Sequence, residues 1–104
     1  MRPMFNATVE LAERFDSLDQ ADLDNRLDQL VDFHPAIGWG DQNGTAITIT
    51  FRGDTVLEVA DVARRQINKY ANPNQVEILN VSVVTTADFD RENGIDSVLT
   101  RPAD

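Results

Sequence analysis

The chain has 104 residues, of which 41% are hydrophobic and 26% are charged, a composition typical of one soluble globular domain. Eighteen acidic residues against nine basic ones give a formal net charge of −9, and such a chain repels the phosphates of nucleic acids. The absence of cysteine excludes disulfides, thiolate metal sites and thiol catalysis.

The first segment with a regular pattern is predicted to be a strand that buries one face. Apolar and polar residues alternate from residue 5 to residue 11, which is the period of a strand with one wet face. The apolar set is Phe5, Ala7, Val9 and Leu11, and the polar set is Asn6, Thr8 and Glu10.

A helix is predicted next, with Ser17 or Asp19 as its N-cap. Its expected apolar stripe follows the spacing i, i+4, i+7 and i+8 and consists of Leu23, Leu27, Leu30 and Val31. Pro35 should end this helix, because the residue before a proline is pushed away from helical backbone angles.

A β-hairpin should follow, with a short strand over residues 36–39 and a turn at Asn43 and Gly44, a pair that favours tight hairpin turns. Threonines alternate with apolar residues over residues 45–51. This alternation predicts a third strand with Thr48 and Thr50 on its exposed face.

The second helix is predicted to begin at a capping box formed by Thr55 and Glu58. Its expected buried residues are Val56, Val59, Ala60, Ala63, Ile67 and Tyr70. Residues 76–83 should form a fourth strand, and a slip in the alternation near Leu79 indicates a β-bulge. A helical turn is expected from Thr85 onward.

The order of these elements predicts an α+β fold of the ferredoxin-like type, a βαββαβ two-layer sandwich. Its four-stranded antiparallel sheet should carry two helices on one face. We expect a single domain over residues 1–94 and a flexible C-terminal tail over residues 95–104.

The sequence offers no set of residues that would carry catalysis. His34 is the only histidine, so a transition-metal site would lack its further ligands and no nucleophile–base pair is visible. The aspartates between residues 16 and 32 have no glycine turn among them, and their leucine spacing is helical, which is unlike a calcium loop. We therefore predict no enzyme activity, no cofactor and no bound metal.

Two segments resemble small uncharacterised proteins of actinobacteria and their phages. They are Phe33-His34-Pro35-Ala36, before the hairpin, and Thr85-Thr86-Ala87-Asp88-Phe89-Asp90, after the last strand. The resemblance implies a phage-encoded origin and transfers no catalytic residue.

The leading functional hypothesis is a non-enzymatic module that self-associates as a homodimer or binds another protein. Two helices can cover only one face of the sheet, so the other face and the short strand at its edge stay available. The expected interaction surface consists of Thr8, Glu10, Trp39, Thr48, Thr50 and Arg52.

Two alternatives remain open. One is a regulatory site for a small ligand at a dimer cleft, with polar contacts from Asn6, Thr8, Thr48, Thr50 and Arg52. The other is an acidic inhibitor that occupies a basic surface of a host protein. No apolar run approaches the ~20 residues that cross a bilayer, so we expect a cytoplasmic protein without membrane or nucleic-acid partners.

Overall fold

A computed structural model describes residues 2–87 of the chain. Its elements in chain order are β1 (Met4–Arg14), the 3-10 turn η1 (Phe15–Ser17), α1 (Gln20–Gln29), the 3-10 turn η2 (Val31–Phe33), β2 (Ala36–Trp39), β3 (Gly44–Arg52), α2 (Val56–Tyr70) and β4 (Ile78–Thr85). Most of the predicted C-terminal helical turn and the whole predicted tail lie outside the described residues.

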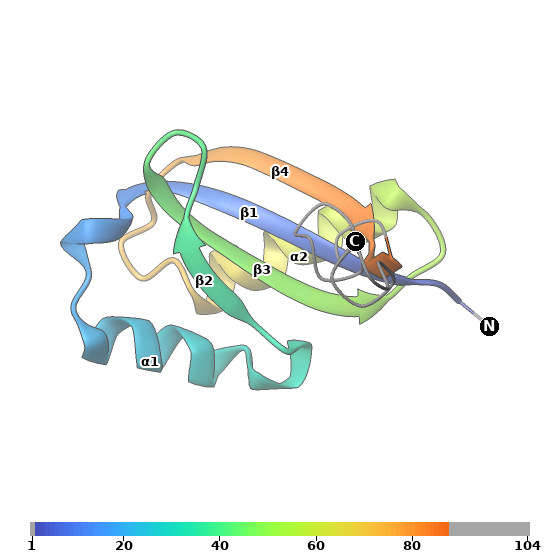
Figure 1. Ribbon diagram of the computed structural model, residues 1–104, viewed down its shortest axis with the longest axis horizontal. Helices are drawn as coiled ribbons and strands as arrows, with labels where there is room; N and C mark the ends of the chain where they lie inside the picture. The colour runs from blue at the N-terminus through green and yellow to red at the C-terminus, as the bar shows by residue number, and fades with distance from the viewer. Residues whose placement is uncertain (1, 88–104) are drawn as a thin grey trace, which may run out of the picture.

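The four strands form one antiparallel sheet in the order β2-β3-β1-β4. Figure 1 shows α2 behind this sheet and α1 along the side where β2 forms the edge. This arrangement confirms the predicted ferredoxin-like two-layer sandwich. The predicted bulge is also confirmed, because the pairing of β1 with β4 shifts between Glu10 and Leu11, where Leu79 is the extra residue.

The core lies between the sheet and α2. One face of β1 and β3 is buried against α2, as the alternation of the strands predicts. The buried apolar residues are Phe5, Ala7, Val9, Leu11, Leu30, Ile47, Ile49, Val59, Ala63, Ile67 and Ala71. The predictions for Val56 and Tyr70 were wrong: both are exposed, because the buried row of α2 recurs every fourth residue and these two residues lie beside it. The row consists of Val59, Ala63, Ile67 and Ala71.

The end of α1 differs from the predicted apolar stripe. Leu30 is buried, but Val31 is 62% exposed. The reason is that α1 ends at Gln29 and the chain turns into η2, so the helical spacing does not continue. Phe33 takes the inward position instead and meets Phe51 edge to face, with ring centroids 5.8 Å apart.

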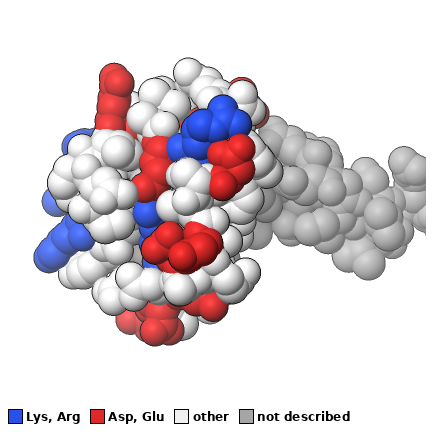
Figure 2. Space-filling view, turned by 90° about the vertical axis from the view of Figure 1, so that its left-hand side faces the viewer, with Lys and Arg blue, Asp and Glu red and all other residues white. Residues whose placement is uncertain are grey.

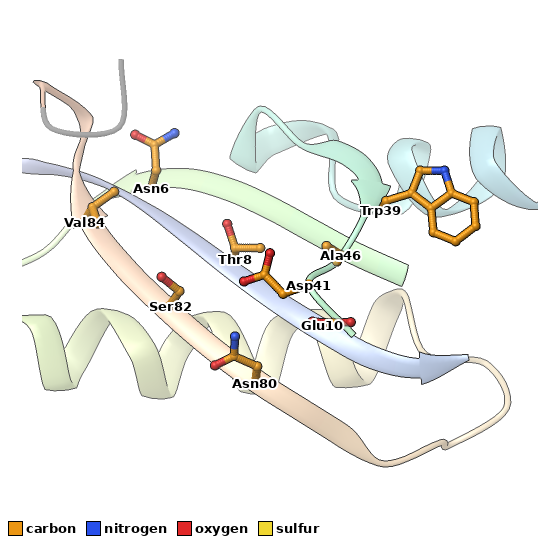
Figure 3. A pocket seen from close by; sticks show the side chains of 10 residues that line it. Asn6, Thr8, Glu10, Trp39, Asp41, Ala46, Asn80, Ser82 and Val84 are labelled. Carbon is orange, nitrogen blue, oxygen red and sulfur yellow. The ribbon is translucent and has the colours of Figure 1, made fainter. Parts of the chain in front are cut away.

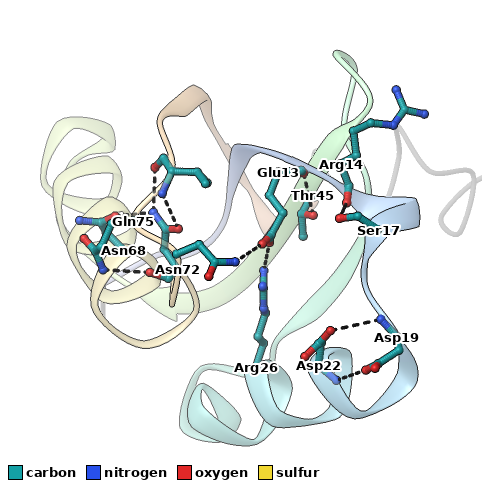
Figure 4. A network of polar contacts seen from close by, with 12 residues as sticks. Glu13, Arg14, Ser17, Asp19, Asp22, Arg26, Thr45, Asn68, Asn72 and Gln75 are labelled. Carbon is teal, nitrogen blue, oxygen red and sulfur yellow. Dashed lines mark hydrogen bonds and ion pairs between the residues drawn. The ribbon is translucent and has the colours of Figure 1, made fainter.

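A buried ion pair joins α1 to the rest of the molecule. Arg26 is the one buried residue of α1, and its guanidinium donates to the carboxylate of Glu13 on β1. The second carboxylate oxygen, Oε2, accepts from Nδ2 of Asn74 at 2.7 Å, and the backbone carbonyl of Glu13 accepts from Oγ1 of Thr45 at 2.9 Å. Glu13 thus links β1 to α1, to β3 and to the α2–β4 loop (Figure 4). The hydrogen bond from Arg26 lowers the pKa of Glu13 below its usual range.

The α2–β4 loop is shaped by Asn72, whose side chain is buried. Its Nδ2 donates to Oδ1 of Asn68 at 2.7 Å and to the carbonyl of Val76 at 2.9 Å, while its Oδ1 accepts from the Val76 amide at 3.0 Å. Because these bonds fold the loop around one side chain, Asn74 is held within reach of Glu13.

We predict that Arg26→Ala destabilises the protein far more than the loss of an exposed arginine. The substitution leaves the Glu13 carboxylate buried without its cation, which typically costs about 3 kcal/mol or more. The matched control is Arg65→Ala, because Arg65 pairs with Asp61 at 3.0 Å in an exposed position, and this pair should contribute less than about 1 kcal/mol. Urea unfolding of both variants measures the difference, and equal losses would contradict the role given to Arg26.

The lowered pKa of Glu13 predicts a contribution to stability that depends on pH. The unfolded state binds the proton more tightly than the folded state, so this contribution is complete above the usual carboxyl pKa and is lost as pH falls through the lowered folded value. The measurement is the difference in free energy of unfolding between the native protein and Glu13→Gln. We expect it to be constant above about pH 6 and to shrink below about pH 4.5; a difference that stays constant down to about pH 3 would refute this.

Candidate functional site

The face of the sheet opposite the helices is polar and lies open among the described residues. Asn6, Thr8 and Glu10 of β1 point to this face and pair in register with Thr50, Thr48 and Ala46 of β3. On the other side of β1, the same residues pair with Val84, Ser82 and Asn80 of β4. We call this surface the open face.

Cross-strand hydrogen bonds organise the middle of the open face. Nδ2 of Asn6 donates to Oγ1 of Thr50 at 2.9 Å, and the hydroxyls of Thr8 and Thr48 are 2.6 Å apart. Each pair belongs to neighbouring strands, so the side chains are fixed by the register of the sheet. The result is a rigid polar floor whose threonine hydroxyls largely satisfy one another.

At one end of the open face, the β2–β3 loop folds over Glu10. The carboxylate oxygen Oε2 of Glu10 accepts the backbone N–H groups of Gln42 and Gly44, both at 2.9 Å. Glu10 is only 2% exposed, and no lysine or arginine among residues 2–87 forms an ion pair with it. Two backbone dipoles therefore hold a buried negative charge that no cation neutralises within the described structure.

The same contact requires glycine in the loop. A Cβ at Gly40 would lie 2.2 Å from Cδ of Glu10, and a Cβ at Gly44 would lie 2.1 Å from the backbone oxygen of Leu11. Asn43, between them in sequence, adopts a φ of 65°, in the left-handed region that asparagine tolerates better than most residues. The predicted hairpin is thus confirmed, and its glycines serve the approach to Glu10 as well as the turn.

A shallow pocket of about 190 Å³ lies between the loop and the sheet. In Figure 3, the Asp41 side chain extends from the loop over the β1 floor near Thr8, and Glu10 lies at the base of the loop. The full lining is Asn6, Thr8, Glu10, Trp39, Gly40, Asp41, Ala46, Asn80, Ser82 and Val84. Both ionisable residues in this lining are acids, so the pocket favours cationic groups.

Asn6 closes the far end of the pocket and has an unused acceptor. Its residue is 8% exposed, its Nδ2 is bonded to Thr50, and its Oδ1 is buried without a hydrogen-bond partner. Figure 3 shows this oxygen turned toward the β4 side, where Val84 also lines the pocket. A buried amide oxygen without a donor is unusual among buried polar groups.

The six residues predicted as an interaction surface do not form one patch. Thr8, Glu10, Thr48 and Thr50 share the open face, and the pairing of Arg52 with Met4 places Arg52 on the same face at the end of β3. Figure 3 shows the ring of Trp39 pointing away from the pocket. Trp39 lines the pocket with its other atoms. Trp39 pairs with Thr45, so its side chain belongs to the helix side of the sheet.

Trp39 takes part in a separate aromatic contact. Its ring meets Phe15 with centroids 5.4 Å apart, Arg14 lies 5.9 Å from its centroid, and 54% of the residue remains exposed. Arg14 also makes a two-pronged ion pair with Asp16 through two 3.0 Å bonds, which lower the pKa of Asp16. This cluster stabilises the β1–η1 connection.

Arg52 lies at the end of β3, beyond the pocket. Its guanidinium donates to the carbonyl of Arg2 at 2.8 Å, and Arg2 returns a 3.1 Å bond to the carbonyl of Arg52. The residue thus fastens the chain before β1 to the end of β3 and adds no positive charge to the pocket lining.

Acidic groups also surround the pocket end of the molecule. Figure 2 views this end and shows several groups of acidic side chains, with basic side chains beside some of them. No group of three or more histidine, cysteine or acidic residues within residues 2–87 is arranged to hold a metal ion. None of the helices in the same range is long and apolar enough to cross a membrane.

Sequence reasoning found the open face but missed the parts played by Glu10 and Asp41. A glutamate on the wet face of a strand normally indicates a solvated side chain, and nothing local shows that a loop 30 residues later folds onto it. Comparisons with family models, curated proteins and solved structures found no match to this chain. The resemblance to actinobacterial and phage proteins therefore stays a prediction.

We predict opposite outcomes for alanine at two neighbouring glycines. Gly40→Ala forces a methyl group into the space of the Glu10 side chain and should cost about 1–3 kcal/mol of stability. Gly38→Ala is the matched control, because no atom lies within 4 Å of a Cβ there, and it should change stability by less than about 0.5 kcal/mol or raise it slightly. Thermal and urea unfolding measure both, and equal effects would contradict the tight packing of the loop on Glu10.

Proposed function

We propose that this protein is a non-enzymatic protein-interaction module whose open face docks a second polypeptide. The observation that carries the proposal is the pocket at the loop end of the open face, with a buried carboxylate at its base that lacks a cation among the described residues. Buried charges are costly unless they are paired, so a site of this kind gains from a partner that supplies positive charge.

The organisation of the open face supports docking rather than catalysis. The hydroxyls of Thr8 and Thr48 bond each other, and Thr50 accepts from Asn6, so neither pair holds a nucleophile against a general base. A floor that is already hydrogen-bonded and fixed by strand register loses little conformational entropy when a partner covers it.

Charge favours a basic partner protein over a second copy of the chain. The net charge of −9 makes two copies repel each other, whereas a basic surface would be attracted and steered to the acidic end. The same argument weighs against the alternative of an anionic small ligand, because Glu10 and Asp41 would repel it. Homodimer formation is the competing outcome and is tested alongside.

The test compares two charge-matched arginine variants as tagged baits in cells of the source organism. Ser82→Arg places a long cation on the exposed open face in the lining of the pocket, and Asn25→Arg adds the same charge to the exposed surface of α1. We expect a partner that Ser82→Arg binds about tenfold more weakly and that Asn25→Arg retains. Quantitative mass spectrometry, followed by titration with the purified partner, measures the ratio.

Size-exclusion chromatography with light scattering provides the second arm of this test. We expect a monomer whose mass does not rise with concentration. If the native protein is a dimer and Ser82→Arg is a monomer, the polypeptide on the open face is a second copy of the chain, and the proposal of a basic partner is wrong. A monomer whose captured proteins are the same for both variants would contradict docking on the open face.

A further inference from the structure

We propose that the pocket on the open face receives the guanidinium of an arginine side chain from the partner polypeptide. This inference rests on the proposed function and gives the chemistry of the group that is recognised. Four features of the pocket lead to it, and each concerns a different atom or dimension of the site.

The first feature is the incomplete pairing of Glu10. Its Oε2 is engaged by the N–H groups of Gln42 and Gly44, but the structure gives its other oxygen no donor among the described residues. Glu10 is only 2% exposed as a residue, and its carboxylate is held only by backbone dipoles. It therefore gains most from a cation that also donates hydrogen bonds, because charge-assisted bonds are the strong ones. The contacts that hold Oε2 of Glu10 thus leave its other carboxylate oxygen to accept from a ligand.

The second feature is Asp41, which adds a second negative group on the loop side. Asp41 is exposed, lines the pocket and makes no ion pair within residues 2–87. Figure 3 shows its carboxylate extended over the floor between Thr8 and Ala46. A planar guanidinium with five donors can serve two carboxylates at once, whereas a compact ammonium is more strongly hydrated and loses more on burial.

The third feature is size. The pocket volume of about 190 Å³ is below the roughly 300–1,000 Å³ of sites that enclose metabolites and cofactors. It suits one long side chain that enters from the surface. This favours a residue of a partner polypeptide over a free ligand of larger size.

The fourth feature is independent of the two acids: the unpartnered Oδ1 of Asn6 at the far end. Asn6 and Glu10 are four residues apart on β1, or about 13 Å along the strand. An arginine side chain is shorter than this distance, so one that lies along β1 with its guanidinium at Glu10 places its own main chain on the Asn6 side. A main-chain N–H of the partner is then the natural donor for Asn6, and a free guanidinium or polyamine lacks that group.

The experiment titrates small probes into the uniformly ¹⁵N-labelled protein. The probe is N-acetyl-arginine methylamide, and the reporters are the amide signals of Gln42 and Gly44, whose N–H groups donate to Glu10. We expect saturable shifts of these signals with a Kd on the order of millimolar. The citrulline analogue has nearly the same shape without the charge and should produce no saturable shift.

Further probes separate the possible sources of the cation. Ethylguanidinium and spermidine should bind at least about threefold more weakly than the arginine probe, because they cannot offer a main-chain N–H to Asn6. If spermidine binds more tightly, the pocket is a polyamine site and the inference is overturned. The lysine analogue should also bind more weakly than the arginine analogue.

Two charge-matched variants localise the binding. Asp41→Asn should weaken arginine binding about threefold to fivefold, as for the loss of one exposed ion pair. Asp28→Asn removes the same charge from the exposed surface of α1 and should change binding by less than about 1.5-fold, because salt screens distant charges. Equal effects of the two variants would mean that only the overall charge attracts the probe, which overturns the inference.

The outcomes for this inference and for the proposed function are distinguishable. If Ser82→Arg loses a partner that Asn25→Arg retains but the arginine probe leaves Gln42 and Gly44 unchanged, the open face is a docking surface and the arginine assignment is wrong. If the probe binds as expected but the two baits capture the same proteins, the pocket recognises arginine and the docking proposal is wrong.

Discussion

The ion pair between Glu13 and Arg26 is the contact on which the placement of the first helix depends. Arg26 is the one buried residue of α1, so the helix is located by a polar contact more than by a broad apolar face. A buried ion pair adds little net stability relative to a well-packed apolar pair, but it tolerates few alternative positions. With Asn74 and Thr45 also bound to Glu13, one residue sets the mutual positions of α1, β3 and the α2–β4 loop.

Glu10, a second buried glutamate of β1, is held by different contacts. Glu13 has an arginine of its own chain, whereas Glu10 has two backbone N–H groups and, among the described residues, no cation. Two backbone dipoles take the place of solvent around the Glu10 carboxylate, and its negative potential extends into the adjacent pocket. Glu13 is therefore paired within the fold, whereas the negative charge of Glu10 can still attract a cation from outside.

The sequence predicted the sheet, its helices and its exposed threonines because these depend on periods of two and 3.6 residues, which are local. Thr48 and Thr50 face outward as expected, and Asp19 caps α1 in a capping box with Asp22. The side-chain partners of Glu10 and Arg26 could not be predicted in this way, because each is set by contacts between distant parts of the chain. The same limit explains why the face of Trp39 could not be predicted: the face on which its side chain lies depends on its pairing with Thr45.

The bulge in β4 has a consequence for how copies of this protein behave at high concentration. From Ile78 to Thr85 the strand at this edge has no charged residue and no proline, so its sequence resembles segments that stack into fibrils. The irregular register beside Leu79 bends the strand and breaks the regular spacing that another edge would need. The bulge thus makes the β4 edge a poorer template for strand addition than a regular edge strand would be.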